Sequence, residues 1–420
     1  MNAAEPGRGG AQVRLILGKG GAGRTTIAAA TAAALAAAGR KVLLASLDQA
    51  HSLSDVLGRP VGRGHEILVG AGVDAVEIDT LALLEERYRG LVAVLALGGA
   101  HDHGAQFADL APEELTGLPG VEDLLGLGEI VRLAGQGRWD VVVVDCPPTA
   151  DALRALALPE TVSGYVERVW PQHRRVTAMT AGSSADTRVA FAVAMLDRVL
   201  DATAAVSALL TDRSRTAVRV VTSAERVGLA ETRRVLSAAA LAGLRVDAVV
   251  VNKLLPQADS GTSTPGGGDW YDTCRAGQQD ALTDIRAASD TVTVLAADHQ
   301  AAEPLGWDAL DGLARAVYSD NDALDPSERS RNDRTPVRVA LESGSGDLES
   351  VYAMRMHLPL ADPGTLTLGR VEDDLLVGAD GRRRRVRLAS VLRRCIVQGA
   401  EFDGADLVVR FVPDPAVWPQ

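Results

Sequence analysis

Residues 18–26 have the residue types and spacing that a phosphate-binding loop requires. The apolar run Val13–Leu17 leads into Gly-Lys-Gly-Gly-Ala-Gly-Arg-Thr-Thr, and an alanine-rich segment follows. Glycines let successive backbone N–H groups converge on phosphate oxygens, and a helix N-terminus adds the positive end of its dipole. The pattern predicts a nucleotide site that binds ATP or ADP through residues 20–26, namely Gly20, Gly21, Ala22, Gly23, Arg24, Thr25 and Thr26.

Two basic residues in this loop depart from the usual pattern. Arg24 stands where a lysine is expected, and Lys19 directly follows the first glycine. A compact ammonium reaches between phosphate oxygens, and a planar guanidinium does not replace it faithfully. We therefore expect both residues to act on the phosphates, with Arg24 weakening catalysis.

Two aspartates follow strand-like runs. Val141–Val144 ends in Asp145, and Val42–Ser46 is followed by Asp48. Open α/β sheets place their ligands at the carboxyl ends of strands. We expect Asp145 and the hydroxyl of Thr25 to hold Mg²⁺. From the residues alone, Asp48 either orients a water for attack on a γ-phosphate or caps the following turn.

Strand-like and helical patterns alternate over residues 1–318. Helical patterns at 25–38, 187–210, 230–243 and 277–288 separate short apolar runs, which are Val42–Ser46, Val73–Ile78, Val141–Asp145, Val218–Thr222, Val246–Val251 and Thr291–Leu295. Such alternation predicts an α/β domain, a doubly wound, mostly parallel sheet with helices on both faces. Residues 80–135 and 163–210 are expected to be helical.

The pattern of apolar and polar residues changes after a polar segment, 319–335, that is typical of a linker. Residues 336–420 predict a small all-β sandwich: apolar and polar residues alternate over 354–360, and Asp380-Gly381 separates two strand-like runs as a hairpin turn would. The run Arg382–Arg385 is either a patch for phosphate or an acidic partner, or a solvated sheet edge.

Composition narrows the function class. The formal net charge of −12 disfavours nucleic-acid binding. We expect no membrane span, because no apolar run reaches about 18 residues, and no secretory signal, because residues 1–10 have no apolar segment. Three widely separated cysteines, Cys146, Cys274 and Cys395, indicate a reducing cytoplasm.

Four segments in order resemble the arsenical pump and tail-anchored-protein targeting ATPases, whose phosphate loop has an early lysine. The segment from Asp48 resembles D-P-A-H-S-L-S-D, with Gln49 for the proline, and the segment from Asp145 resembles the second switch D-x-[AP]-P-T-G, with Ala150 for the glycine. The resemblance implies that Asp48 positions the attacking water and that residues 50–55 belong to the first switch. It also implies that Lys19 reaches a dimer partner's nucleotide and that Asn252, in VVVNKLLP, binds adenine. The C-terminal segment resembles an α-crystallin-like domain of the small heat-shock-protein type.

Within this family we expect a nucleotide-gated chaperone or targeting factor for hydrophobic membrane-protein segments, with peripheral rather than integral membrane contact. Helices within 80–135 and 163–210 would form its groove. Six apolar residues are either part of its lining or part of the core, namely Met179, Met195, Leu196, Leu200, Leu209 and Leu210. It would act as a homodimer or as a heterodimer with a paralogue. The separated cysteines disfavour an arsenite pump and predict no structural zinc. The alternatives are a catalytically weakened partner subunit of an active paralogue, which Arg24 favours, an anion pump subunit, and a cell-positioning ATPase.

Overall fold

The computed structural model describes residues 10–97, 111–180, 186–257, 268–289, 292–319, 324 and 337–418. The chain divides into two compact units, Met1–Ala217 with Ala301–Ser319, and Val218–Gln300 with Asp320–Gln420. The predicted domain borders at 318 and 336 stay predictions. Of the predicted linker, only Ser319 and Leu324 lie among the described residues.

The described residues include an eight-stranded sheet with the order β3-β4-β2-β5-β1-β6-β7-β8. Strand pairs β1–β5, β2–β5, β2–β4, β6–β7 and β7–β8 are parallel, and β3–β4 is antiparallel. The strands are β1 (Gln12–Gly18), β2 (Val42–Ser46), β3 (Ile67–Gly70), β4 (Val73–Glu77), β5 (Val141–Asp145), β6 (Thr216–Ser223), β7 (Val246–Leu254) and β8 (Thr293–Asp298). The predicted mostly parallel α/β sheet is confirmed.

The central strands are buried because helices cover them. All residues of β2 and β5 are buried, as expected for strands whose runs are continuously apolar. Helix α1 (Arg24–Ala37) buries nearly all of its alanines, so the small side chains let it pack closely on the sheet. Helix α11 (Trp307–Val317) packs against α1, and just beyond its end the Tyr318 hydroxyl lies 2.6 Å from Thr31 Oγ1. These contacts fix the helix that begins at the phosphate loop.

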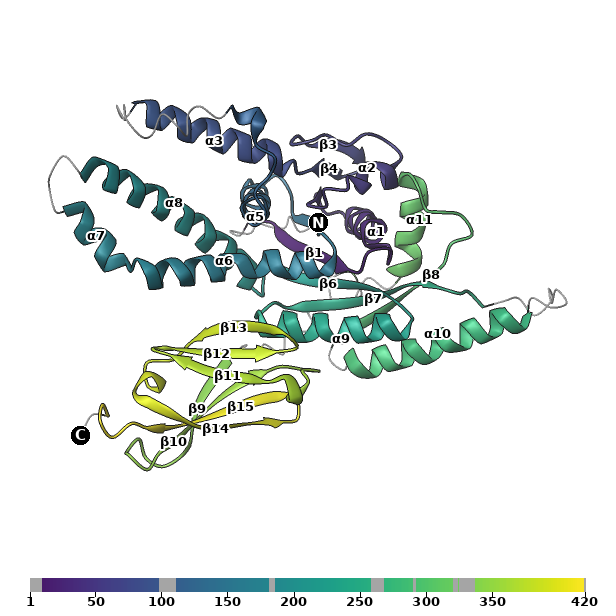
Figure 1. Ribbon diagram of the computed structural model, residues 1–420. Helices are drawn as coiled ribbons and strands as arrows, with labels where there is room; N and C mark the ends of the chain where they lie inside the picture. Colours follow the sequence, from purple (N-terminus) through teal and green to yellow (C-terminus); the bar gives the residue numbers. More distant parts are fainter. Residues whose placement is uncertain are drawn as a thin grey trace, which may run out of the picture. The chain divides into compact units, whose positions relative to one another are not determined.

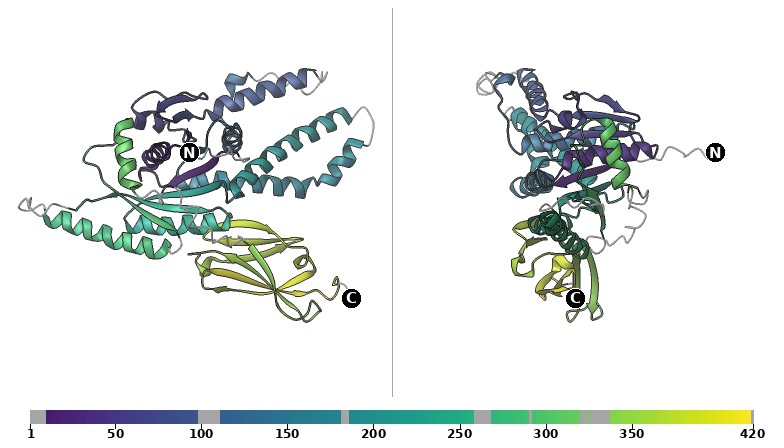
Figure 2. Two further views of the ribbon diagram at one scale, coloured as in Figure 1. Left: turned by 180° about the vertical axis from the view of Figure 1, so that it is seen from behind. Right: turned by 90° about the vertical axis from the view of Figure 1, so that its right-hand side faces the viewer.

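The remaining helices of the first unit are α2 (Ser52–Leu57), α3 (Thr80–Leu97), α5 (Val121–Gly135), α6 (Thr149–Val169), α7 (Gln172–Thr180) and α8 (Asp186–Thr211). Helix α7 follows α6 after a corner, and α8 packs against both. These helices extend beyond the strands of this unit, as does α3 (Figures 1 and 2). Within 80–135 and 163–210, the described residues include these helices, and residues 98–110 and 181–185 lie outside the described part of the chain.

A buried arginine holds the corner where α6, α7 and α8 meet. Arg175 donates to the carbonyl of Trp170 at 2.6 Å and to Asp197 Oδ1 at 3.1 Å, and its Nη1 lies 3.4 Å from Glu167 Oε2. Only 5% of Arg175 is exposed. Because a buried guanidinium requires such partners, this cluster fixes the turn between α6 and α7.

The second unit contains α9 (Arg226–Leu241), α10 (Gly268–Ser289) and two small antiparallel sheets. The first sheet has the order β14-β15-β10-β9 and the second β11-β12-β13. Their strands are β9 (Val337–Ser343), β10 (Val351–His357), β11 (Thr367–Val371), β12 (Asp374–Ala379), β13 (Arg382–Arg387), β14 (Cys395–Asp403) and β15 (Asp406–Pro413). Short 3₁₀ turns lie at Pro112–Glu114, Pro363–Thr365 and Leu392–Arg394. Both sheets contribute to one buried core that includes Met354, Leu375, Leu407 and Phe411, which confirms the small all-β domain.

The predicted hairpin at Asp380-Gly381 is present, and it contacts helix α9. Asp380 and Gly381 have φ values of 51° and 75°, which a two-residue hairpin turn of this type requires. Ser237 Oγ on α9 donates to Asp380 Oδ2 at 2.6 Å, and Arg384 donates to the Leu241 carbonyl at 2.8 Å. Arg385 donates to Asp374 Oδ2 at 2.5 Å. At least two arginines of the run 382–385 therefore bind groups of their own chain.

Among the described residues, no helix is both long enough and apolar enough to cross a bilayer.

Candidate active site

The loop between β1 and α1 has the open backbone that the sequence predicts. Gly21 and Gly23 have φ values of 81° and 87°, a left-handed conformation that glycine adopts without strain. A Cβ placed on Gly20 or Gly21 would meet no atom within 4 Å. Lys19, Gly20 and Gly21 are exposed, whereas Arg24 and Thr25 are buried. The loop therefore leaves room beside its backbone for a phosphate chain.

The parallel strands bring Thr25 and Asp145 together. Asp145 ends β5, the neighbour of β1, and is completely buried. Thr25 Oγ1 donates to Asp145 Oδ2 at 2.8 Å and lies 3.0 Å from Ser52 Oγ, while Ser46 Oγ donates to Asp145 Oδ2 at 3.4 Å. One carboxylate and three hydroxyls form a hard oxygen donor set, which fits Mg²⁺ bound partly by phosphates and water. Burial raises the pKa of Asp145 to about 6, even though Arg24 and Thr25 act in the opposite direction.

Arg24 binds both aspartates of the site. Its Nε donates to Asp145 Oδ1 at 3.1 Å, its Nη2 donates to Asp48 Oδ2, and its Nη1 donates to the Gly18 carbonyl at 3.2 Å. The guanidinium is 7% exposed. Its positive charge therefore offsets the negative charges of two carboxylates that lie close together. A lysine ammonium lacks the planar set of N–H donors that lets the guanidinium bind both at once. Sequence reasoning placed Arg24 at the phosphates and did not anticipate this pairing.

Asp48 lies beyond the end of β2, beside the same group. Its backbone N–H donates to Ser46 Oγ at 3.2 Å, and its Oδ1 accepts the N–H of Ala50 at 3.1 Å. Asp48 thus caps the next turn and also faces Arg24, so the two interpretations of this carboxylate are compatible. Its side chain is 15% exposed.

Glu77 at the end of β4 is a buried acid that the sequence analysis missed. Its Oε1 accepts the N–H of Ser54 at 3.0 Å and the Ser54 hydroxyl at 2.9 Å, and its Oε2 lies 3.3 Å from His51 Nδ1. His51 has a φ of 53°, which is uncommon for a non-glycine residue. These contacts anchor residues 51–54 and so support the turn at Asp48. An acidic residue closing an apolar strand is the signal that could have identified Glu77.

The second switch segment continues directly into helix α6. Ala150 replaces the glycine of the family pattern and lies in the first turn of the helix, which begins at Thr149. The Thr149 hydroxyl is buried and has no hydrogen-bond partner among the described residues. Burial and the nearby Asp145 carboxylate raise the pKa of the Cys146 thiol to about 12, so this thiol stays protonated and unreactive.

Asn252 belongs to the second compact unit, whereas the phosphate loop belongs to the first. Asn252 is 7% exposed, and its Oδ1 accepts the N–H of Lys253 at 2.9 Å. Gln278 on α10 ties the same strand end in place, since it accepts the Leu255 N–H at 2.7 Å and donates to the Lys253 carbonyl at 3.2 Å. The adenine-binding role of Asn252 stays a prediction.

The three cysteines are free thiols, two of them buried. Within the described part of the chain, no group of three or more His, Cys, Asp or Glu side chains could hold a metal ion. The candidate Mg²⁺ site is of another kind, because phosphate and water would supply most of its ligands. The absence of structural zinc stays a prediction.

The sequence of the chain is similar to a known protein family and to several known proteins. Residues 11–319 match the model of the anion-transporting ATPases, and residues 349–411 match an HSP20-like domain found in ArsA. The chain is 44% identical to protein Rv2184c of Mycobacterium tuberculosis over 97% of this chain and 98% of that protein. It is 26% identical to the putative arsenical pump-driving ATPase 1 of Aquifex aeolicus over 94% and 99%, respectively. It is 29% identical to the ATPase GET3 of Malassezia globosa over 57% of this chain and 71% of that protein. The phosphate loop, the two aspartates and these matches together show that the chain belongs to the anion-transporting ATPase family and carries its HSP20-like domain.

Proposed function

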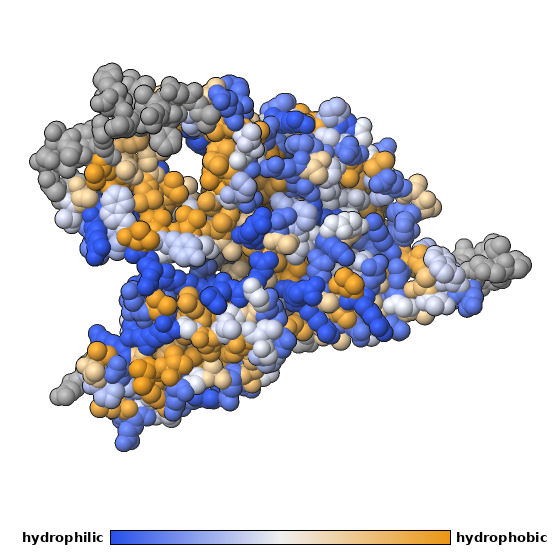
Figure 3. Space-filling model, viewed as in Figure 1, coloured by the Kyte–Doolittle hydropathy of each residue, from blue (hydrophilic) through white to orange (hydrophobic). Residues whose placement is uncertain are grey.

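We propose that this chain is a Mg²⁺-dependent ATPase that acts as a dimer and binds hydrophobic protein segments under the control of its nucleotide. The observation that carries the proposal is a set of exposed apolar side chains on helices α6–α8, in the same compact unit as the phosphate loop. Tyr165, Val169, Val176 and Val199 are 68%, 81%, 54% and 43% exposed. In Figure 3, apolar side chains gather on this face of the molecule in the region of α3 and α8.

This surface has the chemistry of a client site. Exposed apolar patches of this kind mark sites for protein segments or membranes, and an amphipathic or apolar helix can lie between helices that present apolar faces. Two of the candidate lining residues, Leu209 and Leu210, are buried at 7% and 5% exposure and belong to the core instead. Met195, Leu196 and Leu200 are half-buried, and the side chain of Met179 lies outside the described residues.

The site residues divide the work of ATP hydrolysis. Backbone N–H groups of residues 20–26 would hold the phosphates, while Thr25 and Asp145 would hold Mg²⁺, which neutralises charge on the phosphate oxygens when bound. Asp48 would accept a proton from the attacking water and orient it. Lys19, exposed at the start of the loop, would reach the phosphates of the second subunit.

A labelled peptide tests the client site directly. A fluorescein-labelled helix of about 20 leucine and alanine residues mimics a membrane segment. We expect it to bind at least about tenfold more tightly in one nucleotide state than in the other, because apolar area is exposed in only one of them. The double variant Val169→Asp with Val176→Asp should lose this binding. Val227→Asp, which changes a valine that is 57% exposed on α9, is the matched control. Equal binding by all forms in every nucleotide state would contradict the proposal.

A second candidate function, a weakened partner subunit of an active paralogue, rests on the contacts of Arg24. A guanidinium bound to Asp48 and Asp145 must release them before they can act on water and Mg²⁺. Breaking these ion pairs therefore adds to the free-energy barrier of hydrolysis, an addition that a lysine at this position would avoid. An arsenite pump subunit, the third candidate, has no support from a thiolate cluster among the described residues.

Arg24→Lys distinguishes the first two candidates. We expect the lysine variant to hydrolyse ATP at least about tenfold faster than the wild type, since a lysine cannot bridge both carboxylates with one planar fork. Steady-state phosphate release measures the effect, and Arg40→Lys, at a half-buried arginine just beyond the turn that follows α1, serves as the matched control. Unchanged turnover would mean that the guanidinium acts as well as a lysine, and the weakened-subunit candidate would then be abandoned.

A further inference from the structure

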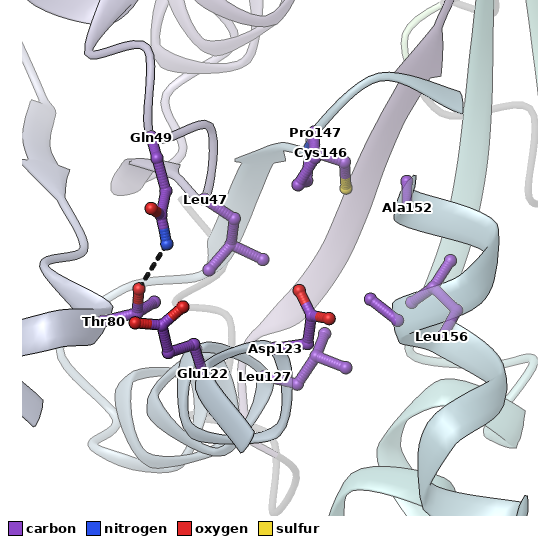
Figure 4. Close-up of a pocket in the computed structure, with 12 residues that line it drawn as sticks. Leu47, Gln49, Thr80, Glu122, Asp123, Leu127, Cys146, Pro147, Ala152 and Leu156 are labelled. Atoms are coloured by element: carbon purple, nitrogen blue, oxygen red, sulfur yellow. Dashed lines mark hydrogen bonds between the residues drawn. The ribbon is translucent and has the colours of Figure 1, made fainter. Parts of the chain in front are cut away.

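Gln49 connects the first switch loop to helix α3. Its Nε2 donates to Thr80 Oγ1 at 2.5 Å, and Figure 4 shows the amide pointing toward this hydroxyl. Thr80 is the first residue of α3 and is 5% exposed. The family pattern has proline at position 49, which offers no side-chain donor. This hydrogen bond is therefore a feature of the present sequence rather than of the pattern.

The hydroxyl of Thr80 is available for this contact because another residue caps the helix. Asp79 Oδ1 accepts the N–H of Ala82 at 2.9 Å, the usual contact of a helix-capping side chain. The helix therefore does not depend on the Thr80 hydroxyl for its own start. The hydroxyl acts as the point at which the loop holds the helix.

Helix α5 meets the same junction through a glycine. A Cβ on Gly126 would lie 2.9 Å from Leu47 Cδ2 and 3.2 Å from Thr80 Cγ2. The absence of a side chain at Gly126 lets α5 lie close to Leu47 and to the start of α3. Helix α5 in turn packs against α3, α6 and α8, so the junction touches the frame of the proposed client site.

A cavity beside the junction gives it room to rearrange. It has a volume of about 30 Å³ (Figure 4). Its lining includes Leu47 and Gln49 on either side of Asp48, Cys146 and Pro147 of the second switch, and Gly126 of α5. Close-packed interiors resist gradual deformation, and space next to a loop lets a side chain move without breaking the core. The cavity lies where the two switch segments face each other.

We propose that the Gln49–Thr80 hydrogen bond transmits the nucleotide state to helix α3. Gln49 is covalently next to Asp48, whose carboxylate is held by Arg24 in this structure. When Asp48 leaves Arg24 to act at the nucleotide, Gln49 must move with it and pull on the first turn of α3. The coupling to client binding rests on the proposed function, whereas the coupling to α3 itself does not.

Hydrogen exchange in residues 81–90 tests the link without any client. We expect a non-hydrolysable ATP analogue with Mg²⁺ to change exchange there by about tenfold in the wild type, because nucleotide shifts the local opening equilibrium of the first turns of α3. In Thr80→Val and in Gln49→Ala, this change should fall to about twofold or less, since one hydrogen bond accounts for roughly a two- to twelvefold effect. Thr80→Ser keeps the hydroxyl and should keep the full change.

The control is Thr283→Val, which removes an exposed hydroxyl of α10 that donates to the Gln279 carbonyl of the same helix at 2.8 Å. It should behave like the wild type. A nucleotide effect of equal size in Thr80→Val and the wild type, or no nucleotide effect in the wild type, would overturn the proposal. The labelled peptide separates the link to α3 from the proposed client function. If exchange in α3 responds to nucleotide but the peptide binds in no nucleotide state, the link is supported and the client function is rejected.

Discussion

Asp48→Asn is expected to lower the ATP hydrolysis rate by about a thousandfold, because general-base and water-positioning groups contribute roughly 10²–10⁴. Asparagine keeps the size of the side chain but cannot accept the proton of the attacking water. The oxygens of Thr25 and Asp145, which would hold Mg²⁺, are unchanged by this substitution. Nucleotide affinity should stay within about threefold of the wild type by calorimetry, since the loss falls on the transition state.

Asp311→Asn is the matched control, because this aspartate on α11 forms an ion pair with Arg315, one helical turn away and within the same helix. It should leave both quantities unchanged. A rate for Asp48→Asn close to that of the wild type would assign the positioning of water to another group.

Lys19→Ala should produce an effect of similar size by a different route. A cation supplied in trans to a transferring phosphoryl group contributes about 10³–10⁵ to the rate. Lys19 is exposed and lies outside the buried cluster of Arg24, Thr25 and Asp145, as a group that serves a second subunit must be. We expect loss of dimerisation with the ATP analogue, a rate at least about a hundredfold lower, and nearly unchanged ATP binding to the isolated chain.

Sedimentation velocity with ADP and with the analogue measures the association. Lys41→Ala is the matched control, because Lys41 is also an exposed lysine of the same unit and contacts Asp140 through its backbone N–H and carbonyl, which the substitution keeps. A protein that stays monomeric with both nucleotides, alone and with each candidate paralogue, would remove the role of Lys19.

Local sequence patterns predicted the parts of the site that backbone geometry determines. Apolar runs ending in Asp145 and just before Asp48 predict two strands of a mostly parallel sheet, whose carboxyl ends share one edge. The sequence did not predict that these two strands are neighbours, and the structure pairs them in parallel. The Asp380-Gly381 turn was predicted for the same reason, because its backbone angles favour these two residues. These signals are local, and the structure agrees with them.

Contacts between side chains distant in sequence could not be predicted in the same way. Arg24 was expected to face phosphates, yet it binds Asp145, which lies 121 positions away. The closeness of Gly126 to Leu47 depends on how α5 packs, and a single glycine within a helical pattern does not reveal its neighbour. Strand β3 was missed because it is a short edge strand in which Leu68 is 65% exposed, so it lacks the continuous apolar run of the central strands.

The central claim is a Mg²⁺-dependent nucleotide site built on residues 20–26 with Asp145. Calorimetric titration of the full chain with ADP and with a non-hydrolysable ATP analogue, with and without Mg²⁺, tests it most directly. We predict about one site per chain and an affinity about tenfold or more weaker without Mg²⁺, because Thr25 and Asp145 would hold the metal, which would neutralise charge on the phosphate oxygens. Thr25→Val should bind nucleotide with little dependence on Mg²⁺. Absence of binding in every condition, or binding that ignores Mg²⁺ in the wild type, would contradict the account.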